Sequence, residues 1–212
     1  MAKKPAQPKK AAKDKDLDAV VAAAMGLAAE RDWREIGLAE IAAAAGTTLA
    51  DLLVEYPSKL AILGGFMREI DRRVLTGFEP ESDSGSARDR LFDVLMRRFD
   101  TLEPHKAAIG RIMSAACRDP LIGITVGGSM LRSMGLMLEA AGIASDGLRG
   151  GVKSKGLAAL YGATLRDWLK DDTTDKSRTM AALDARLRRA EGWANSLKSM
   201  PFSRRMAGTP QS

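Results

Sequence analysis

The chain has 212 residues, of which 45% are hydrophobic, so it can build a buried core in one ordinary domain or two small ones. The single cysteine, Cys117, excludes a disulfide framework within the chain, and the single histidine, His105, leaves too few ligands for the usual zinc sites. The net charge is +6, but residues 1–16 hold six lysines and two aspartates, a net +4, which leaves +2 for the rest. The body of the protein is therefore nearly neutral.

The sequence contains no stretch of about twenty uncharged apolar residues. The longest candidate, residues 121–143, contains Arg132, Glu139 and several glycines, so we predict a core segment and not a membrane span. The N-terminus lacks an apolar stretch after its lysines, so a secretory signal is not expected. These features predict a cytoplasmic protein.

The first part of the chain predicts a basic tail and four helices. Residues 1–16 are rich in lysine, alanine and proline and are expected to be disordered. Apolar residues at intervals of three and four predict a helix over 17–30, and a short alanine-rich helix then stops at Gly46. Thr48, with Asp51 three residues later, caps a short helix over 49–56, and Ser58 caps a longer one over 59–75. The short helices joined at Gly46 form a helix-turn-helix pattern.

Residues 77–86 are rich in proline, glycine and serine and predict a boundary between domains over 17–76 and 87–197, with a flexible tail over 198–212. Helical periods then cover residues 87–102, 106–117, 121–141, 151–169 and 177–197. No segment alternates like a strand, so the predicted fold class is all-α.

The last two predicted helices carry matching apolar faces. The final helix has a narrow seam made of Met180, Leu183, Leu187, Ala190, Ala194 and Leu197. The preceding helix carries Leu157, Leu160, Tyr161, Thr164, Leu165 and Trp168 on one side. These faces fit either a core within the chain or a homodimeric four-helix interface.

The segment EIAAAAGTTLADLLVEYPSKLAIL, residues 40–63, resembles the signature of the TetR family of bacterial transcriptional repressors. The matching positions are Ile41, Ala42, Ala45, Gly46, Thr48, Tyr56, Ser58 and Lys59. The likeness covers residues 17–75, and beyond residue 87 it is architectural only. It implies a TetR-like homodimer whose N-terminal helices bind a palindromic operator in duplex DNA. A larger helical domain would bind a small effector and form the dimer interface.

On this resemblance the candidate DNA contacts are Thr47, Thr48, Leu49, Asp51, Leu52, Tyr56 and Lys59. Residues 38–56 contain three acidic residues and no lysine or arginine, a net charge of −3, although DNA affinity depends largely on neutralising phosphates. Lys59 lies at the start of a helix, where free amides favour a phosphate, and Arg31 and Arg34 flank the motif. The lysine tail is either a DNA-contacting arm or a solubilising extension.

Residues 107–144 are rich in methionine, glycine, alanine and isoleucine, which form either a core or the lining of an apolar pocket. The candidate effector residues are Met113, Met130, Arg132, Met134 and Met137, with Arg132 available for a carboxylate or phosphate group. His105 and Cys117 lack partners for nucleophilic catalysis, and no glycine-rich phosphate loop is present. We therefore predict no enzyme activity, cofactor or metal site.

These features leave three hypotheses. The leading one is a TetR-like DNA-binding regulator that responds to a small apolar effector. The alternative is a protein with the same fold that has lost DNA binding and binds lipid or a protein partner, because residues 165–187 are similar to the closing helices of ubiquinone-biosynthesis lipid-binding proteins. The third is a helical interaction module without a ligand.

Overall fold

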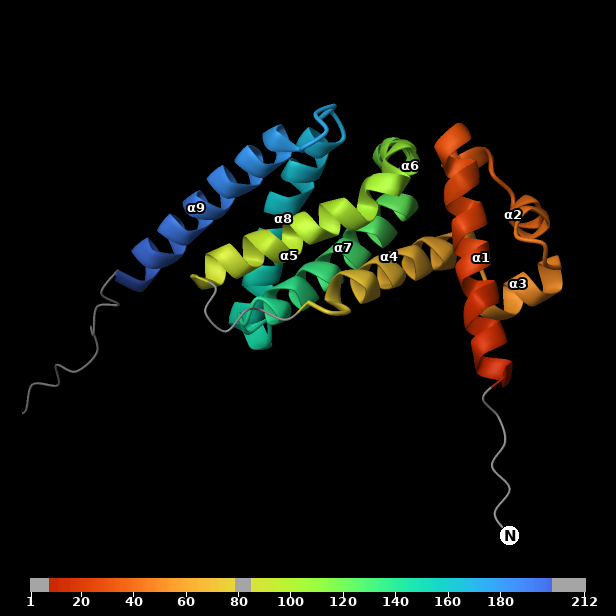
Figure 1. Cartoon of the computed structure of the whole chain (residues 1–212), viewed down its shortest axis with the longest axis horizontal. Coiled ribbons are helices and arrows are strands. Elements are labelled where there is room, and N and C mark those ends of the chain that lie inside the picture. The colour runs from red at the N-terminus through yellow and green to blue at the C-terminus, as the bar shows by residue number, and fades with distance from the viewer. Residues whose placement is uncertain (1–7, 79–84, 200–212) are drawn as a thin grey trace, which may run out of the picture.

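The computed structural model describes residues 8–78 and 85–199, which form helices and turns without a β-strand (Figure 1). A head at one end of the molecule consists of α1 (Pro8–Glu30), η1 (Trp33–Glu35), α2 (Leu38–Ala44) and α3 (Leu49–Glu55). The body consists of α4 (Lys59–Leu75), α5 (Ala87–Leu102), η2 (Glu103–His105), α6 (Lys106–Arg118), α7 (Pro120–Ala140), α8 (Gly147–Trp168) and α9 (Ser177–Ser199). The predicted all-α class is confirmed.

Helix α1 begins at Pro8, nine residues before the predicted start at Leu17. Residues 8–16, expected to be disordered, are therefore helical, while residues 1–7 lie outside the described part of the chain. Proline fits the first turn of a helix, and the alanines and lysines that follow are good helix formers. Helix propensity thus overrides the lack of apolar residues in this segment.

The turns of the head follow the predicted capping signals. Gly46 has φ +70°, a left-handed conformation that suits glycine and ends α2. The Thr48 hydroxyl accepts a hydrogen bond from the Asp51 amide at 3.1 Å and donates one to the Asp51 carboxylate at 2.6 Å. Ser58 caps α4 by accepting a bond from the Ala61 amide at 3.1 Å. These caps fix the angles between α2, α3 and α4.

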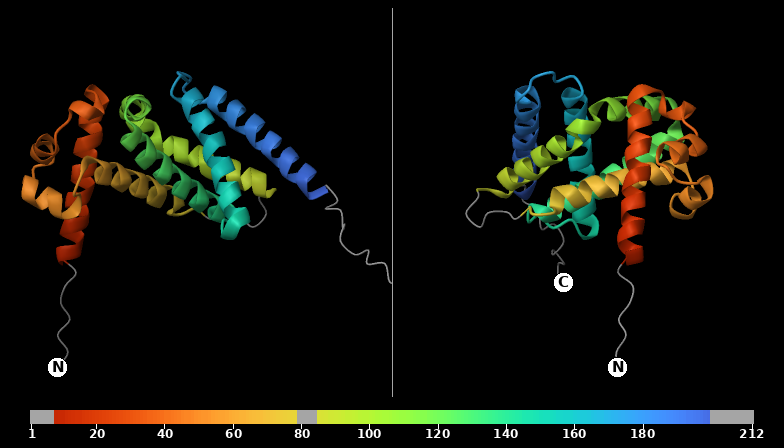
Figure 2. Two further views of the ribbon diagram at one scale, coloured as in Figure 1. Left: turned by 180° about the vertical axis from the view of Figure 1, so that it is seen from behind. Right: turned by 45° about the vertical axis from the view of Figure 1, so that its right-hand side comes forward.

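The body is built around a core that includes the last turn of α5. Phe99 of α5 is fully buried and stacks on Tyr161 of α8, with 4.9 Å between the ring centroids. Trp168 lies 5.7 Å from Phe99 and donates a hydrogen bond from Nε1 to Glu103 at 2.9 Å. Helix α4 runs from the head into this body, so the two parts share a continuous element (Figure 2).

The apolar seam on the last helix packs within the chain. Leu183 and Leu187 of α9 are buried, as are Leu157, Tyr161 and Leu165 of α8, and the two helices contact each other. Ala190 is exposed, and the side chains at 194 and 197 lie outside the described residues. Of the two interpretations of the seam, the intrachain core is therefore the one that the structure supports for Leu183 and Leu187.

Helix α7 is, among the described helices, the one long and apolar enough to cross a membrane by length and composition. It packs against α4, α5, α6 and α8. Its buried face carries Ile122, Met134, Met137 and Leu138 together with the polar Ser133. Of its most apolar stretch, 28% is buried within the described part of the chain.

Candidate functional site

The outer surface of α3 is apolar and acidic. Leu49 and Leu53 are each 41% exposed and Val54 is 80% exposed, whereas Thr48 and Asp51 are exposed but bonded to each other. Thr47, half-buried, lies at the start of the same turn. Four of the predicted DNA contacts therefore lie together, namely Thr47, Thr48, Leu49 and Asp51. The prediction from sequence did not include Leu53 and Val54, which are exposed on the same helix.

Two other predicted DNA contacts are core residues. Leu52 is 1% exposed and Tyr56 is 5% exposed. The Tyr56 ring packs on Gly65 of α4, where a Cβ would lie 2.7 Å from Tyr56 Cε1. Leu52 and Tyr56 are four residues apart and so share the inner face of the chain, which removes them from a DNA-facing surface.

The Lys59 ammonium is bound inside the head, in contrast to the predicted phosphate contact. Lys59 Nζ donates hydrogen bonds to the carbonyls of Trp33 at 3.0 Å, Arg34 at 3.2 Å and Ile36 at 2.7 Å, and lies 5.6 Å from the centre of the Trp33 ring. Burial lowers the pKa of Lys59, although Asp32 nearby favours its charged form. A lysine has three N–H donors, and all three are occupied here, so Lys59 holds η1 against α4.

The arginines that flank the helix-turn-helix are also paired. Arg31 forms an ion pair with Glu40, and Arg34 pairs with Asp32 at 3.0 Å. The hydrogen bonds from Arg34 hold the pKa of the Asp32 carboxyl well below its usual range. These carboxylates cancel much of the positive charge that the arginines would present to DNA.

The other lysines of the head belong, by sequence, to the first turns of α1. Lys9, Lys10, Lys13 and Lys15 fall in the helical segment that precedes Leu17. The N-terminal end of α1 extends beyond the level of α3 (Figures 1 and 2).

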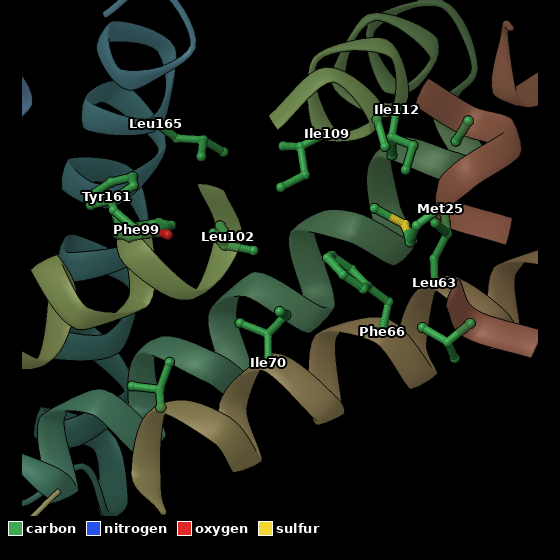
Figure 3. Close-up of a cluster of buried hydrophobic side chains, with 14 of the residues drawn as sticks. Met25, Leu63, Phe66, Ile70, Phe99, Leu102, Ile109, Ile112, Tyr161 and Leu165 are labelled. Atoms are coloured by element: carbon green, nitrogen blue, oxygen red, sulfur yellow. The ribbon is translucent and has the colours of Figure 1, made fainter. Parts of the chain in front are cut away.

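The body contains an apolar cavity of about 50 Å³ between α4, α5, α6, α7 and α8. Most of its wall is hydrophobic, and side chains from α4, α6 and α8 turn toward the same space (Figure 3). The lining residues are Leu63, Phe66, Met67, Arg98, Leu102, Ile109, Ile112, Met113, Val126, Met130, Tyr161 and Leu165.

The predicted pocket residues divide between the cavity and other places. Met113 and Met130 line the cavity, while Met134 and Met137 are fully buried in the core but are not part of its wall. Arg132 is exposed on α7, so the expectation that it serves an effector inside the pocket needs correction. The charged residue in the wall is Arg98, whose position on the buried face of α5 follows Leu91 and Leu95 at helical spacing.

Arg98 belongs to a buried polar network that the sequence analysis missed. Arg98 Nη1 forms an ion pair with Asp71 of α4, and Ser133 of α7 donates a hydrogen bond to the other Asp71 oxygen at 2.8 Å. Arg98 Nη2 also contacts Ser133 Oγ at 3.4 Å. The network joins α4, α5 and α7 beside the cavity. Removing Asp71 or Arg98 would leave the other charge buried and unpaired, so either substitution is expected to destabilise the fold.

Helix α6 connects the cavity with the head. Ile109, Ile112 and Met113 face the cavity, while α6 also packs against α1. Arg111 Nε donates a hydrogen bond to the Ala29 carbonyl of α1 at 3.1 Å, and Arg118 pairs with Asp32 beside η1 at 3.0 Å. A displacement of α6 by a molecule in the cavity would therefore reach α1 and η1 directly.

The two residues considered for nucleophilic catalysis lie apart from the cavity wall. His105 packs edge-on against Phe66, with 5.2 Å between the ring centroids, and burial lowers its pKa. Cys117 is exposed on α6. Within the described residues, no group of three or more histidine, cysteine, aspartate or glutamate side chains is arranged to hold a metal ion.

A helix-turn-helix head joined by α4 and α6 to a helical body with an apolar cavity is the fold of TetR-family transcriptional regulators. The chain is similar to a TetR transcriptional regulator from Nitrosomonas europaea, with a TM-score of 0.67 and 22% identity over 83% of this chain and 98% of the other. A TetR regulator from Rhodococcus sp. RHA1 gives a TM-score of 0.61 and 20% identity over 90% and 99% of the two chains. Salmonella enterica GusR gives a TM-score of 0.57 and 20% identity, over 82% of this chain and 94% of GusR. No protein-family model and no curated protein matches the sequence.

Proposed function

We propose that this protein is a cytoplasmic transcriptional regulator of the TetR type and not an enzyme. It binds a palindromic operator as a homodimer. A small apolar effector changes its affinity for that operator. The observation that carries the proposal is the link through α6. One side of this helix lines the apolar cavity, and the other is bonded to the head through Arg111 and Arg118. An effector that prefers one position of α6 would shift the population of head orientations.

The charge distribution indicates how such a head would hold DNA. The acidic α3 offers no cation to phosphate, and Lys59, Arg31 and Arg34 are already engaged. The lysine-rich segment at the start of α1 would supply the phosphate contacts. Thr48 and Asp51 remain as polar groups for base edges, since a carboxylate accepts from the cytosine amino group.

Selection of bound fragments from random duplex DNA by the full-length protein, at about 0.1 M salt, tests the proposal. Enrichment of one palindrome is expected. Affinity for that sequence should then fall with salt, and the slope of log affinity against log salt should decrease by about 1 for each phosphate that a variant no longer neutralises. The variant for this comparison replaces four lysines by glutamine, namely Lys9, Lys10, Lys13 and Lys15.

A matched control removes four positive charges from the body, at Lys153, Lys170, Arg178 and Arg189, and should leave the slope nearly unchanged. Recovery of no preferred sequence, or equal slopes for the two variants, would contradict the proposal.

The proposed dimer uses the outer face of α8, because the inner face packs against the protein's own core. Leu148 is 89% exposed and Val152 is 65% exposed, and Gly156 and Ala159 follow on the same face at intervals of four and three. Exposed apolar and small residues in one stripe allow a second helix to approach closely.

The exposed apolar side chains of α3 favour a second candidate function. Leu49, Leu53 and Val54 together with a local charge of −3 suit a protein or lipid partner better than a phosphate backbone. On this candidate the DNA selection recovers no motif, and a hydrophobic molecule or a protein partner copurifies with the chain.

A further inference from the structure

Two hydrogen-bond donors in the cavity wall have no acceptor among the described residues. Neither the Tyr161 hydroxyl nor Arg98 Nε forms a hydrogen bond of normal geometry, although the Arg98 guanidinium lies close enough to the Tyr161 oxygen to favour the phenolate. Both side chains are fully buried. The other residues of the wall are leucine, isoleucine, valine, phenylalanine and methionine. Among the residues that line the cavity, these two groups are therefore the hydrogen-bond donors that remain for a polar atom of a bound molecule.

The charge of Arg98 is already balanced. Asp71 neutralises the guanidinium, and Ser133 occupies the second Asp71 oxygen. An anionic ligand would add an uncompensated charge to this buried group, whereas a neutral acceptor oxygen would not. The balance of charge thus favours a neutral ligand.

Tyr161 remains a donor at neutral pH. Burial raises the pKa of Tyr161 to about 12, although the Arg98 guanidinium beside it favours the phenolate. The Tyr161 ring extends from α8 into the group of side chains around the cavity (Figure 3). If the Arg98 Nε–H turned onto the phenol oxygen, the hydroxyl hydrogen would still need an acceptor.

We propose that the effector is a small, neutral, mainly apolar molecule with one carbonyl-type oxygen, which accepts hydrogen bonds from Tyr161 and Arg98. This inference rests on the proposed function and specifies its ligand class. The cavity of about 50 Å³ is roughly a third of the volume that holds benzene, so entry requires the wall to move. Met67, Met113 and Met130 can make room because their unbranched side chains change rotamer readily.

Three probes of nearly the same shape separate the contributions of polarity and charge. Acetophenone carries a neutral carbonyl, α-methylstyrene replaces the oxygen by carbon, and benzoate is anionic. Calorimetric titration of the full-length protein without DNA should show the tightest binding for acetophenone. Tyr161→Phe should weaken acetophenone binding about tenfold and leave α-methylstyrene unchanged.

Thr164→Val is the matched control, because it removes another buried hydroxyl from α8 that does not line the cavity. The Thr164 hydroxyl donates to the Leu160 carbonyl and accepts from Arg186 Nη1. It should not alter the preference for acetophenone. A second measurement uses the apo protein: Tyr161→Phe should melt at the same temperature as the original or above it, because the Tyr161 hydroxyl makes no hydrogen bond of normal geometry within the protein.

The inference is overturned if benzoate binds most tightly, if acetophenone and α-methylstyrene bind equally, or if no probe binds. A fall of several degrees in the melting temperature of Tyr161→Phe would overturn it too, since it would show that the hydroxyl is paired within the protein. These measurements do not involve DNA, so they fail or succeed independently of the operator selection.

Discussion

Single charged side chains hold the loops of this protein by bonding to backbone groups. Lys59 donates to the Trp33, Arg34 and Ile36 carbonyls in the head. Asp171, after α8, is 2% exposed and accepts bonds from the amides and hydroxyls of Thr173 and Thr179. These hydrogen bonds hold loops that bury little apolar surface. Removing one of them should loosen the turn and also the helix that adjoins it.

Asp171→Asn should destabilise the protein and change its response to acid. The hydrogen bonds from Thr173 and Thr179 lower the pKa of Asp171 below its unfolded value. A lowered pKa stabilises the fold at pH values above the unfolded pKa, near 4, and the stabilisation is lost as the pH falls through the folded value. Thermal melts from pH 7 down to 3 should show the variant about 5 °C lower at pH 7 and the difference shrinking below about pH 4. A difference that stays constant with pH would contradict this assignment.

Lys59→Met tests whether Lys59 is structural. Methionine keeps much of the aliphatic length but leaves three carbonyls without their donor, so we expect a loss of about 1–2 kcal/mol in the free energy of unfolding, measured in urea. The salt dependence of DNA binding should not change. A slope reduced by about 1 with unchanged stability would instead identify Lys59 as a phosphate contact.

At the scale of the elements, α4 is held in place by close contact with the head. Gly65 is buried where the Tyr56 ring crosses α4, and the ring occupies the space of a side chain. The adjacent Gly64 faces outward, with only Arg68 within 4 Å of an added Cβ. The difference between the two glycines fixes how Tyr56, at the end of α3, packs on α4.

Gly65→Ala should destabilise the protein by about 1–3 kcal/mol, because the methyl group would lie 2.7 Å from Tyr56 Cε1 and force the ring to move. Gly64→Ala is the matched control: its Cβ meets Arg68 Nη1 at 3.5 Å, and the better helix propensity of alanine predicts a gain of up to about 1 kcal/mol. Chemical denaturation of the two variants measures both effects. Equal changes would show that Tyr56 does not pack as described.

At the scale of the whole molecule, the head, the cavity and the outer face of α8 lie in sequence along the body. The α6 contacts join the first two, and α8 joins the last two because Tyr161 and Leu165 line the cavity while Val152 and Ala159 face outward. A molecule in the cavity therefore touches both the helix that contacts the head and the helix of the proposed dimer interface.

Ala159→Glu should dissociate the proposed homodimer, because it places a charge within the exposed apolar stripe of α8. Sedimentation velocity is expected to show a dimer for the original protein and a monomer for the variant. Lys170→Glu, beyond the end of α8, serves as the control and should remain dimeric. A variant that keeps the original sedimentation coefficient would place the interface elsewhere.

The amphipathic periods and capping residues were sufficient to predict the helices. The bounds of α4 and α5 agree with the predicted ranges, and Thr48 and Ser58 cap as expected. Helices α1 and α8 start earlier than predicted, at Pro8 and Gly147, since alanine, lysine and glycine segments give no apolar period to mark a boundary.

The candidate sites were less predictable, because a motif gives positions and not orientations. Leu52 and Tyr56 matched a DNA-contacting segment but are buried, and Arg132 was the cation expected in the pocket but is exposed. Arg98 could have been found, because it continues the buried face of α5 at helical spacing.

The sequence by itself determined the helical fold, the helix-turn-helix and the acidic character of α3, because periodicity, capping and charge are local properties of the chain. Only the tertiary structure decided which polar groups form hydrogen bonds or ion pairs within the protein. Lys59, Arg31 and Arg34 are taken up by partners elsewhere in the head, and Tyr161 is left with an unused hydroxyl beside the cavity. Hydrogen bonds and ion pairs form between whichever groups the packing of helices brings within reach, and that packing depends on contacts across the whole chain.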